Sequence, residues 1–125
     1  MDLTPRIPGD RQLINSYGNG GFQVSGKTYR GSLLVFPDHV VSWPFDSMAK
    51  LTSDSLAPVW LASPKVELLF LGCGPSIAFV PSEIRATLRQ HGIALEPVDT
   101  GAAARTYNVL MGEGRRVAAA LIAID

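Results

Sequence analysis

The sequence predicts one domain of the mixed α/β class. Its first half contains short apolar segments separated by glycines, which is typical of β-hairpins. Its second half contains a continuous apolar run, "KVELLFLG", and an amphipathic segment, "PSEIRATLRQHG". A chain of 125 residues can bury one hydrophobic core without the help of disulfides or metals. We expect residues 1–12 to form an N-terminal arm and residues 13–125 to form the single domain.

The segment "LINSYGNGGFQVSGKTYRGSLLVF" is predicted to be a β-hairpin region. Apolar and polar residues alternate before Ser25-Gly26, which is a turn signal, and a second segment runs from Tyr29 to Phe36. A further strand is expected in "VVSWPF", where Pro44 ends it because proline lacks a backbone N–H.

The second half is predicted to contain three helices and three strands. The first helix, in "SDSLAPVWLA", would be capped by Ser53, Asp54 or Ser55. It must be short, because Pro58 fits only in a first turn. The other elements are expected at residues 66–71 (a buried central strand), 82–91 (a helix packed on the surface), 93–98 (a strand that Pro97 favours at an edge), 99–112 (a helix) and 116–124 (a strand).

The composition argues against a nucleic-acid partner. Eleven basic residues balance eleven acidic ones, and no run of Lys or Arg is longer than Arg115-Arg116. With 46% hydrophobic residues and a mean hydropathy of +0.17, the chain is apolar. This indicates either a tightly covered core or a surface that a partner covers.

The sequence also indicates a compartment. The single cysteine, Cys73, excludes an intrachain disulfide and agrees with a reducing environment. The start of the chain, "MDLTPRIPGDRQ", lacks the apolar core of a signal peptide. No stretch approaches the roughly 18 apolar residues of a membrane-spanning helix. We therefore expect a soluble cytoplasmic protein without a transmembrane segment.

The Gly72-Cys73-Gly74 loop allows three interpretations: a nucleotide-phosphate loop, a reactive thiol, or a tight turn after a buried strand. A dinucleotide fingerprint needs a third glycine, which is missing, and Pro75 stands where an N–H would be useful. The Lys-Ser/Thr pair of a P-loop is also missing. The tight turn is therefore favoured, with the strand turning beneath Ile77, Phe79 and the helix that follows.

A catalytic Cys73 would need an imidazole beside it. The two histidines, His39 and His91, are far from it in the sequence and form no recognisable metal-ligand pattern with it. A small buried residue between glycines is the favoured interpretation. We predict no catalytic residue, no metal and no cofactor.

The helix expected at residues 99–112 carries two polar residues, Arg105 and Asn108, on one face. Asn is a weak helix former, which indicates that another interaction uses it. One explanation is structural, and the other is a ligand pocket. We expect Arg105, Asn108, Glu113 and Arg115 to cluster near the end of this helix and to orient it against the Gly72–Gly74 loop. Residues expected at a pocket or interaction site are Gly72, Cys73, Gly74, Arg105, Tyr107, Asn108, Glu113 and Arg115.

Three segments, "GSLLVFPDHVVSWP", "LLFLGCGPSIAFVP" and "DTGAAARTYNVLMGEGRRVAAALI", carry a family resemblance. They resemble the Mth938-like domain family, which includes the mitochondrial complex I assembly factor. The resemblance covers residues 13–124, and its most specific parts are Thr106-Tyr107-Asn108 and Glu113-Gly114-Arg115. It implies a compact layered β/β/α fold with a β-hammerhead motif.

The resemblance implies a non-enzymatic role in protein interaction or in the assembly of respiratory complex I. The family offers no established catalytic residues, and the position of Cys73 is commonly not cysteine in it. Because no targeting presequence precedes the domain, a cytoplasmic, bacterial-type member is expected. A protein partner is expected, and a homo-oligomer is compatible with the same role. The alternative is a small-molecule-binding protein or enzyme with a pocket between the Gly72–Gly74 loop and Arg105 and Asn108.

Overall fold

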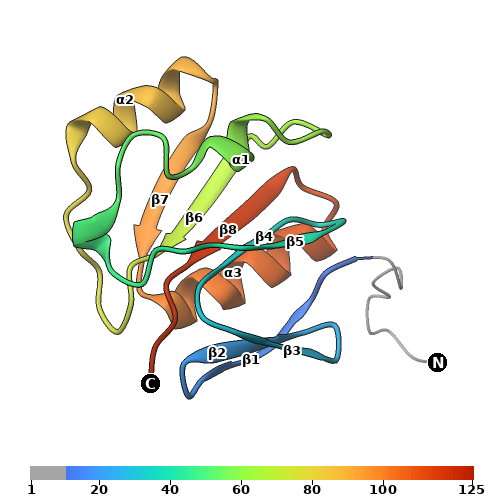
Figure 1. Ribbon diagram of the computed structural model, residues 1–125. Helices are drawn as coiled ribbons and strands as arrows, with labels where there is room; N and C mark the ends of the chain where they lie inside the picture. Colours follow the sequence, from blue (N-terminus) through green and yellow to red (C-terminus); the bar gives the residue numbers. More distant parts are fainter. Residues whose placement is uncertain (1–10) are drawn as a thin grey trace.

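The computed structural model describes residues 11–125 of the protein, so most of the arm expected at residues 1–12 lies outside the described part. The described residues form two β-sheets and three α-helices, which confirms the predicted mixed α/β class (Figure 1). The elements are β1 (Ile14–Gly18), β2 (Gly21–Val24), β3 (Lys27–Arg30), β4 (Leu33–Val35), β5 (Val40–Ser42), η1 (Met48–Lys50), α1 (Ala57–Trp60), β6 (Leu68–Gly72), α2 (Ser82–Gln90), β7 (Ala94–Val98), α3 (Thr100–Gly112) and β8 (Val117–Leu121).

The small sheet is an antiparallel meander of β1, β2 and β3. Two-residue turns, Asn19-Gly20 and Ser25-Gly26, connect the strands, and all four residues have positive φ. Such turns match the twist of the paired strands. The hairpin expected at Ser25-Gly26 is therefore confirmed.

The expected strand from Tyr29 to Phe36 is wrong as a single element. Gly31, at φ +81°, divides it into β3 and β4, which belong to different sheets. The two halves differ in burial, because β3 is largely exposed whereas every residue of β4 is buried. The apolar residues of β4 therefore belong to the large sheet, and the chain turns at Gly31 before it reaches them.

The large sheet has the strand order β5-β4-β8-β6-β7. β6 is parallel to both of its neighbours, and its residues Leu69, Phe70 and Leu71 are buried. The predicted buried strand inside the sheet is confirmed, although it begins at Leu68 rather than at residue 66 and the middle strand is β8. β7, which contains Pro97, lies at the edge as expected.

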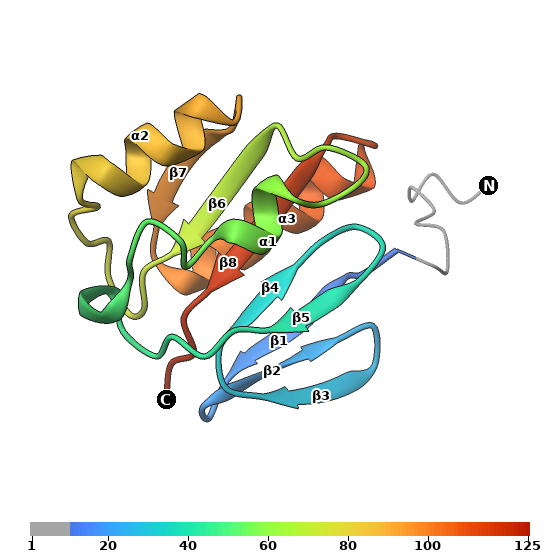
Figure 2. The same ribbon diagram turned by 45° about the horizontal axis from the view of Figure 1, so that its top comes forward.

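Two layers cover the large sheet. α1, η1 and α2 lie on one face, whereas α3 and the small sheet lie on the other (Figures 1 and 2). The residues of β8 alternate between the two layers: Ala119 and Leu121 face α3, and Ala118 and Ala120 face the opposite core. The small side chain of Ala119 allows α3 to approach the sheet through its buried residues Ala103, Ala104, Tyr107 and Met111.

The helices agree with the prediction except at one cap. α2 and α3 lie close to the expected ranges, and Asp99 caps α3 by accepting a hydrogen bond from the Ala102 N–H. α1 begins after Leu56 without a side-chain cap, so the expected cap at Ser53, Asp54 or Ser55 is wrong. Ser55 is instead buried, and its hydroxyl accepts a hydrogen bond from the Thr52 N–H.

Candidate functional site

The Gly72-Cys73-Gly74 loop follows β6 and is bonded to the segments beside it. The Cys73 N–H donates to the Val98 carbonyl over 2.8 Å, and the Gly74 N–H donates to Thr100 Oγ1 over 3.0 Å. A phosphate loop needs free backbone N–H groups directed at the ligand. Here both amides have protein partners, and α2 begins well beyond the loop. The geometry fits a structural turn.

Steric constraints explain why both positions of this loop are glycine. A Cβ at Gly72 would lie 2.9 Å from the Cα of Thr100, which is too close for any other residue. Gly74 has a φ of +110°, a conformation that side chains with a Cβ rarely adopt. The glycines therefore allow the end of β6 to pack directly on the first turn of α3.

Thr100 joins three segments at this point. Its hydroxyl donates to the Ile122 carbonyl over 2.7 Å and accepts from the Gly74 N–H, and its own N–H donates to the Gly74 carbonyl over 2.9 Å. The Ile122 N–H donates to the Gly72 carbonyl over 3.0 Å. Thr100 is fully buried. Its hydroxyl therefore provides the hydrogen bonds that water cannot, and it connects the ends of β6 and β8 with the start of α3.

Cys73 has the environment of a structural residue. It is 7% exposed, and its thiol donates to the Leu71 carbonyl over 3.6 Å. Burial raises the pKa of the Cys73 thiol, and backbone hydrogen bonds with Ala78 and Val98 oppose this only in part. A reactive thiolate needs the opposite shift.

Arg105 and Asn108 connect α3 to β1. Asn108 Oδ1 accepts from the Ile14 N–H over 2.9 Å, and its Nδ2 donates to the Ile14 carbonyl over 2.8 Å. Arg105 Nη1 donates to the Tyr17 hydroxyl over 3.0 Å at an exposed position. The hydroxyl of Tyr17 lies over Gly101, where a Cβ would be only 2.5 Å away. Both polar residues therefore attach the small sheet to the helix.

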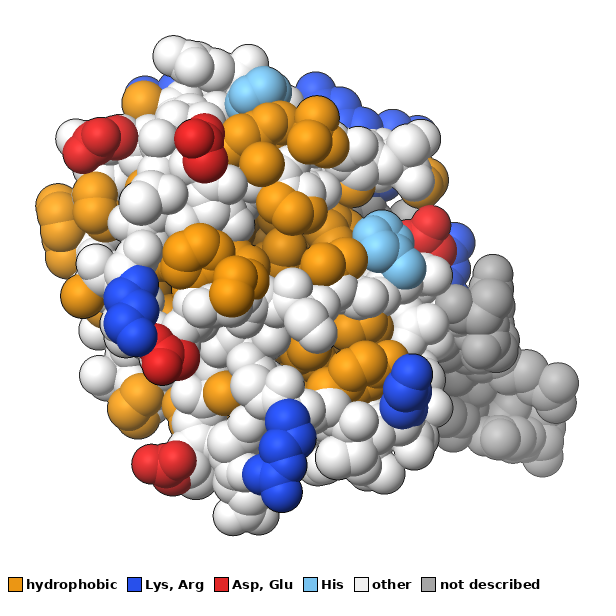
Figure 3. Space-filling model, in the orientation of Figure 1, with side chains coloured by type: hydrophobic (Ala, Val, Ile, Leu, Met, Phe, Trp, Pro, Cys, Tyr) orange, Lys and Arg blue, Asp and Glu red, His pale blue; other side chains and the backbone are white. Residues whose placement is uncertain are grey.

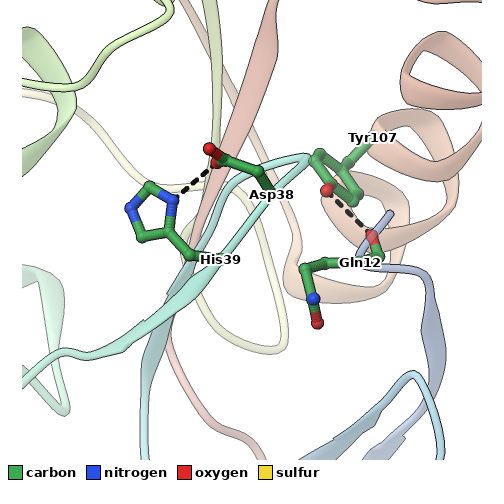
Figure 4. A network of polar contacts seen from close by, with 4 residues as sticks. All are labelled: Gln12, Asp38, His39 and Tyr107. Atoms are coloured by element: carbon green, nitrogen blue, oxygen red, sulfur yellow. Dashed lines mark hydrogen bonds and ion pairs between the residues drawn. The ribbon is translucent and has the colours of Figure 1, made fainter. Parts of the chain in front are cut away.

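Tyr107 is fully buried between these contacts. Its hydroxyl donates to the Gln12 carbonyl over 2.8 Å, as Figure 4 shows. Burial raises the pKa of the Tyr107 hydroxyl, while the charge of Arg11 acts in the opposite direction. Tyr107 thus holds the segment before β1 against α3.

The expected cluster of Arg105, Asn108, Glu113 and Arg115 against the glycine loop is not what the structure shows. The loop packs on Thr100, at the start of α3. Asn108 lies eight residues further along the helix, which corresponds to about 12 Å. Glu113 and Arg115 follow the other end of α3 and are exposed. The four residues are close in the sequence, but the length of α3 separates them from the glycine loop.

Two exposed apolar side chains stand out in the connection between β6 and α2. Ile77 is 64% exposed and Phe79 is 85% exposed. Their neighbours Ala78 and Val80 face the core, so the segment is anchored at alternate positions and presents the other two outward. We expected both residues to cover the turn, and this is wrong. Residues 77–80 are all apolar, so the sequence does not mark Ile77 and Phe79 as the exposed positions.

A broader apolar area covers the face of the molecule that carries β5 and α1. Figure 3 shows hydrophobic side chains gathered there, with histidines at the border. His91 stacks on Trp60 with ring centroids 4.6 Å apart, and His39 stacks on Phe36 at 4.2 Å. Each histidine therefore stacks on a different aromatic ring, and neither stacking pair includes Cys73.

Within residues 11–125, no group of three or more His, Cys, Asp or Glu residues is arranged to hold a metal ion. No helix in this part of the chain has both the length and the apolar character needed to cross a bilayer.

With this geometry, the chain can be compared with known proteins. Residues 14–122 match the family described as "Protein of unknown function (DUF498/DUF598)". The chain belongs to this family. It is 40% identical over 123 residues to an uncharacterized protein of Rhodobacter capsulatus, covering 96% of this chain and 93% of that one.

Assembly factors are also among the relatives. NADH dehydrogenase [ubiquinone] 1 alpha subcomplex assembly factor 3 of Homo sapiens is 35% identical over 122 residues, which are 98% of this chain. The match spans 66% of the human protein and 59% of the protein of the same name from Rattus norvegicus.

Solved structures support the Mth938-like assignment. A Bordetella pertussis protein described as a Mth938-like domain superposes with a TM-score of 0.80 at 27% identity, covering 100% of this chain and 95% of that one. A protein of Bartonella henselae, described as an outer membrane protein, superposes with a TM-score of 0.85 at 35% identity, covering 96% of this chain and 100% of that one.

The two hydrogen bonds of Asn108 predict a structural effect. Asn108→Ala leaves the N–H and the carbonyl of Ile14 without their partners, so the free energy of unfolding should fall by about 1 to 3 kcal/mol. Arg105→Ala, which removes an exposed contact on the same helix, should change it by less than about 0.5 kcal/mol. Urea unfolding measures both variants. Equal, small effects would show that Asn108 does not hold β1.

Replacement of Cys73 should be tolerated. Serine can donate to the Leu71 carbonyl as the thiol does, so Cys73→Ser should change the free energy of unfolding by no more than about 1 kcal/mol. In the parent protein, a thiol reagent should react only as fast as the chain opens. Rapid labelling of the folded protein would contradict the burial argument.

Proposed function

We propose that this protein is a non-enzymatic interaction module that takes part in assembling an NADH dehydrogenase complex. The observation that carries the proposal is the 35% identity to the human assembly factor over 98% of this chain. The similarity extends over the whole packed domain rather than over one motif, which favours a shared mode of action. The cytoplasmic location expected from the sequence belongs to the same proposal.

The contact surface in this proposal is the segment that carries Ile77 and Phe79. Covering a large apolar side chain stabilises a complex by about 1.5 to 3 kcal/mol relative to leaving it exposed. These two side chains already point outward, because their neighbours Ala78 and Val80 pack against the core. A partner with a complementary apolar groove would therefore bind without first ordering the segment.

A small-molecule pocket between the glycine loop and the side chains of Arg105 and Asn108 is not part of this proposed function. The backbone amides of the loop are bonded to Val98 and Thr100, and Asn108 is bonded to β1. These groups would have to give up internal partners before they could hold a ligand. The interaction role requires no such rearrangement.

Deletion of the gene and complementation test the proposal. Loss of the protein should lower the amount of assembled NADH dehydrogenase on native gels, and the parent gene should restore it. The double variant Ile77→Ser/Phe79→Ser should stay folded, since both side chains are exposed, but should fail to restore assembly.

The matched control is Val109→Ser, which changes a side chain that is 60% exposed on α3, away from this segment. It should complement like the parent. An unchanged level of assembled enzyme in the deletion strain would contradict the assembly role. Full complementation by the double variant would contradict the contact surface alone. A copy of the chain with a second tag would detect a homo-oligomer in the same cells.

A further inference from the structure

A pocket of about 340 Å³ lies at the end of the large sheet where β6 begins, opposite the Ile77 and Phe79 segment that follows the end of β6. The connections β4–β5, α1–β6 and α3–β8 meet there, at the right in Figures 1 and 2. Its size is in the lower part of the range of small-molecule sites, about 300 to 1,000 Å³. The lining residues are Arg11, Phe36, Pro37, Asp38, Ala62, Ser63, Pro64, Lys65, Val66, Gly114, Arg115, Arg116 and Val117.

The charge of this pocket differs from that of the whole chain. Acidic and basic residues are equal in number over the sequence. The pocket, however, is lined by the basic residues Arg11, Lys65, Arg115 and Arg116 and by one acidic residue, Asp38. The carboxylate of Asp38 is engaged with His39 Nδ1 at 2.6 Å (Figure 4). The pocket therefore carries an excess of positive charge.

The four basic side chains differ in their surroundings within residues 11–125. The Arg116 guanidinium lies 3.9 Å from the Glu67 carboxylate, and the Lys65 ammonium lies beside Gly92. Within residues 11–125, the guanidinium groups of Arg11 and Arg115 make neither an ion pair nor a hydrogen bond. A guanidinium group matches the two oxygens of a carboxylate or phosphate.

One wall of the pocket is apolar. Phe36, Val66 and Val117 are almost completely buried there, so Pro37, Ala62 and Pro64 provide the apolar surface that a ligand can reach. Such a wall suits a ligand that has a compact hydrocarbon part as well as an acidic group. Inorganic phosphate alone would leave this wall uncovered.

We propose that this pocket binds a small organic anion. Its carboxylate or phosphate group contacts Arg11 and Arg115, and its apolar body lies against Pro37, Ala62 and Pro64. The site is independent of the assembly role, because its lining residues do not include the Ile77 and Phe79 segment.

Titration of the ¹⁵N-labelled protein with defined probes tests this site. Benzoate, which combines a carboxylate with an apolar ring, should shift the amide resonances of Ala62, Ser63, Lys65 and Val66 and of residues 114–117 in a saturable manner. Benzamide, which has the same shape without the charge, should produce no saturable shift there. Phosphate should bind more weakly than benzoate.

Charge variants supply the controls. Arg11→Gln and Arg115→Gln should each weaken benzoate binding about tenfold, as expected for the loss of one charge-assisted contact. Asp38→Asn should tighten it, because it removes the one acidic residue of the lining. Arg30→Gln, which changes an exposed arginine on β3, should have no effect. The spectra report whether each variant is folded.

Three results would overturn the proposal. Equal binding of benzamide would remove the role of the charge. Benzoate affinity unchanged in both Arg11→Gln and Arg115→Gln would show that the anion lies elsewhere. Tighter binding of an acidic peptide, acetyl-Asp-Glu-Asp-Glu-amide, than of benzoate at these resonances would assign the pocket to a partner's acidic segment instead of a small molecule.

Discussion

The hydroxyl of Thr100 is the interaction on which the arrangement of the large sheet and α3 depends. It donates to the Ile122 carbonyl and accepts from the Gly74 N–H, so one buried group satisfies the ends of β6 and β8. A buried polar group without a partner is costly, which gives this contact a large influence on the position of the helix. The absence of a Cβ at Gly72 then allows the backbone of the strand to reach the first turn of α3.

The other half of α3 holds the small sheet. Asn108 pairs with both backbone groups of Ile14, and Tyr107 fixes the Gln12 carbonyl. The polar residues that are most conspicuous in the sequence of this helix are therefore used inside the fold. The surfaces that remain for recognition are the apolar segment of Ile77 and Phe79, which follows the end of β6, and the basic pocket, which lies where β6 begins.

The sequence predicted the elements whose patterns are local. The apolar run of β6 and the helices α2 and α3 were placed within a few residues, because their periods and end signals lie inside the segments themselves. The break at Gly31 was missed, since the choice of sheet depends on distant strands. The partner of Asn108 lies 94 residues away, so the spacing along one helix could not identify it. The exposure of Phe79 likewise depends on which neighbours the fold leaves beside it.

The central claim is that the Gly72–Gly74 loop and Thr100 form a structural junction and not a ligand site. Comparison of the free energies of unfolding of Thr100→Val and Thr100→Ser in urea tests it most directly. Valine keeps the shape of the side chain and loses the hydroxyl, whereas serine keeps the hydroxyl and loses a methyl group. The account predicts that Thr100→Val loses about 1 to 3 kcal/mol and is less stable than Thr100→Ser. A valine variant as stable as the parent would contradict it.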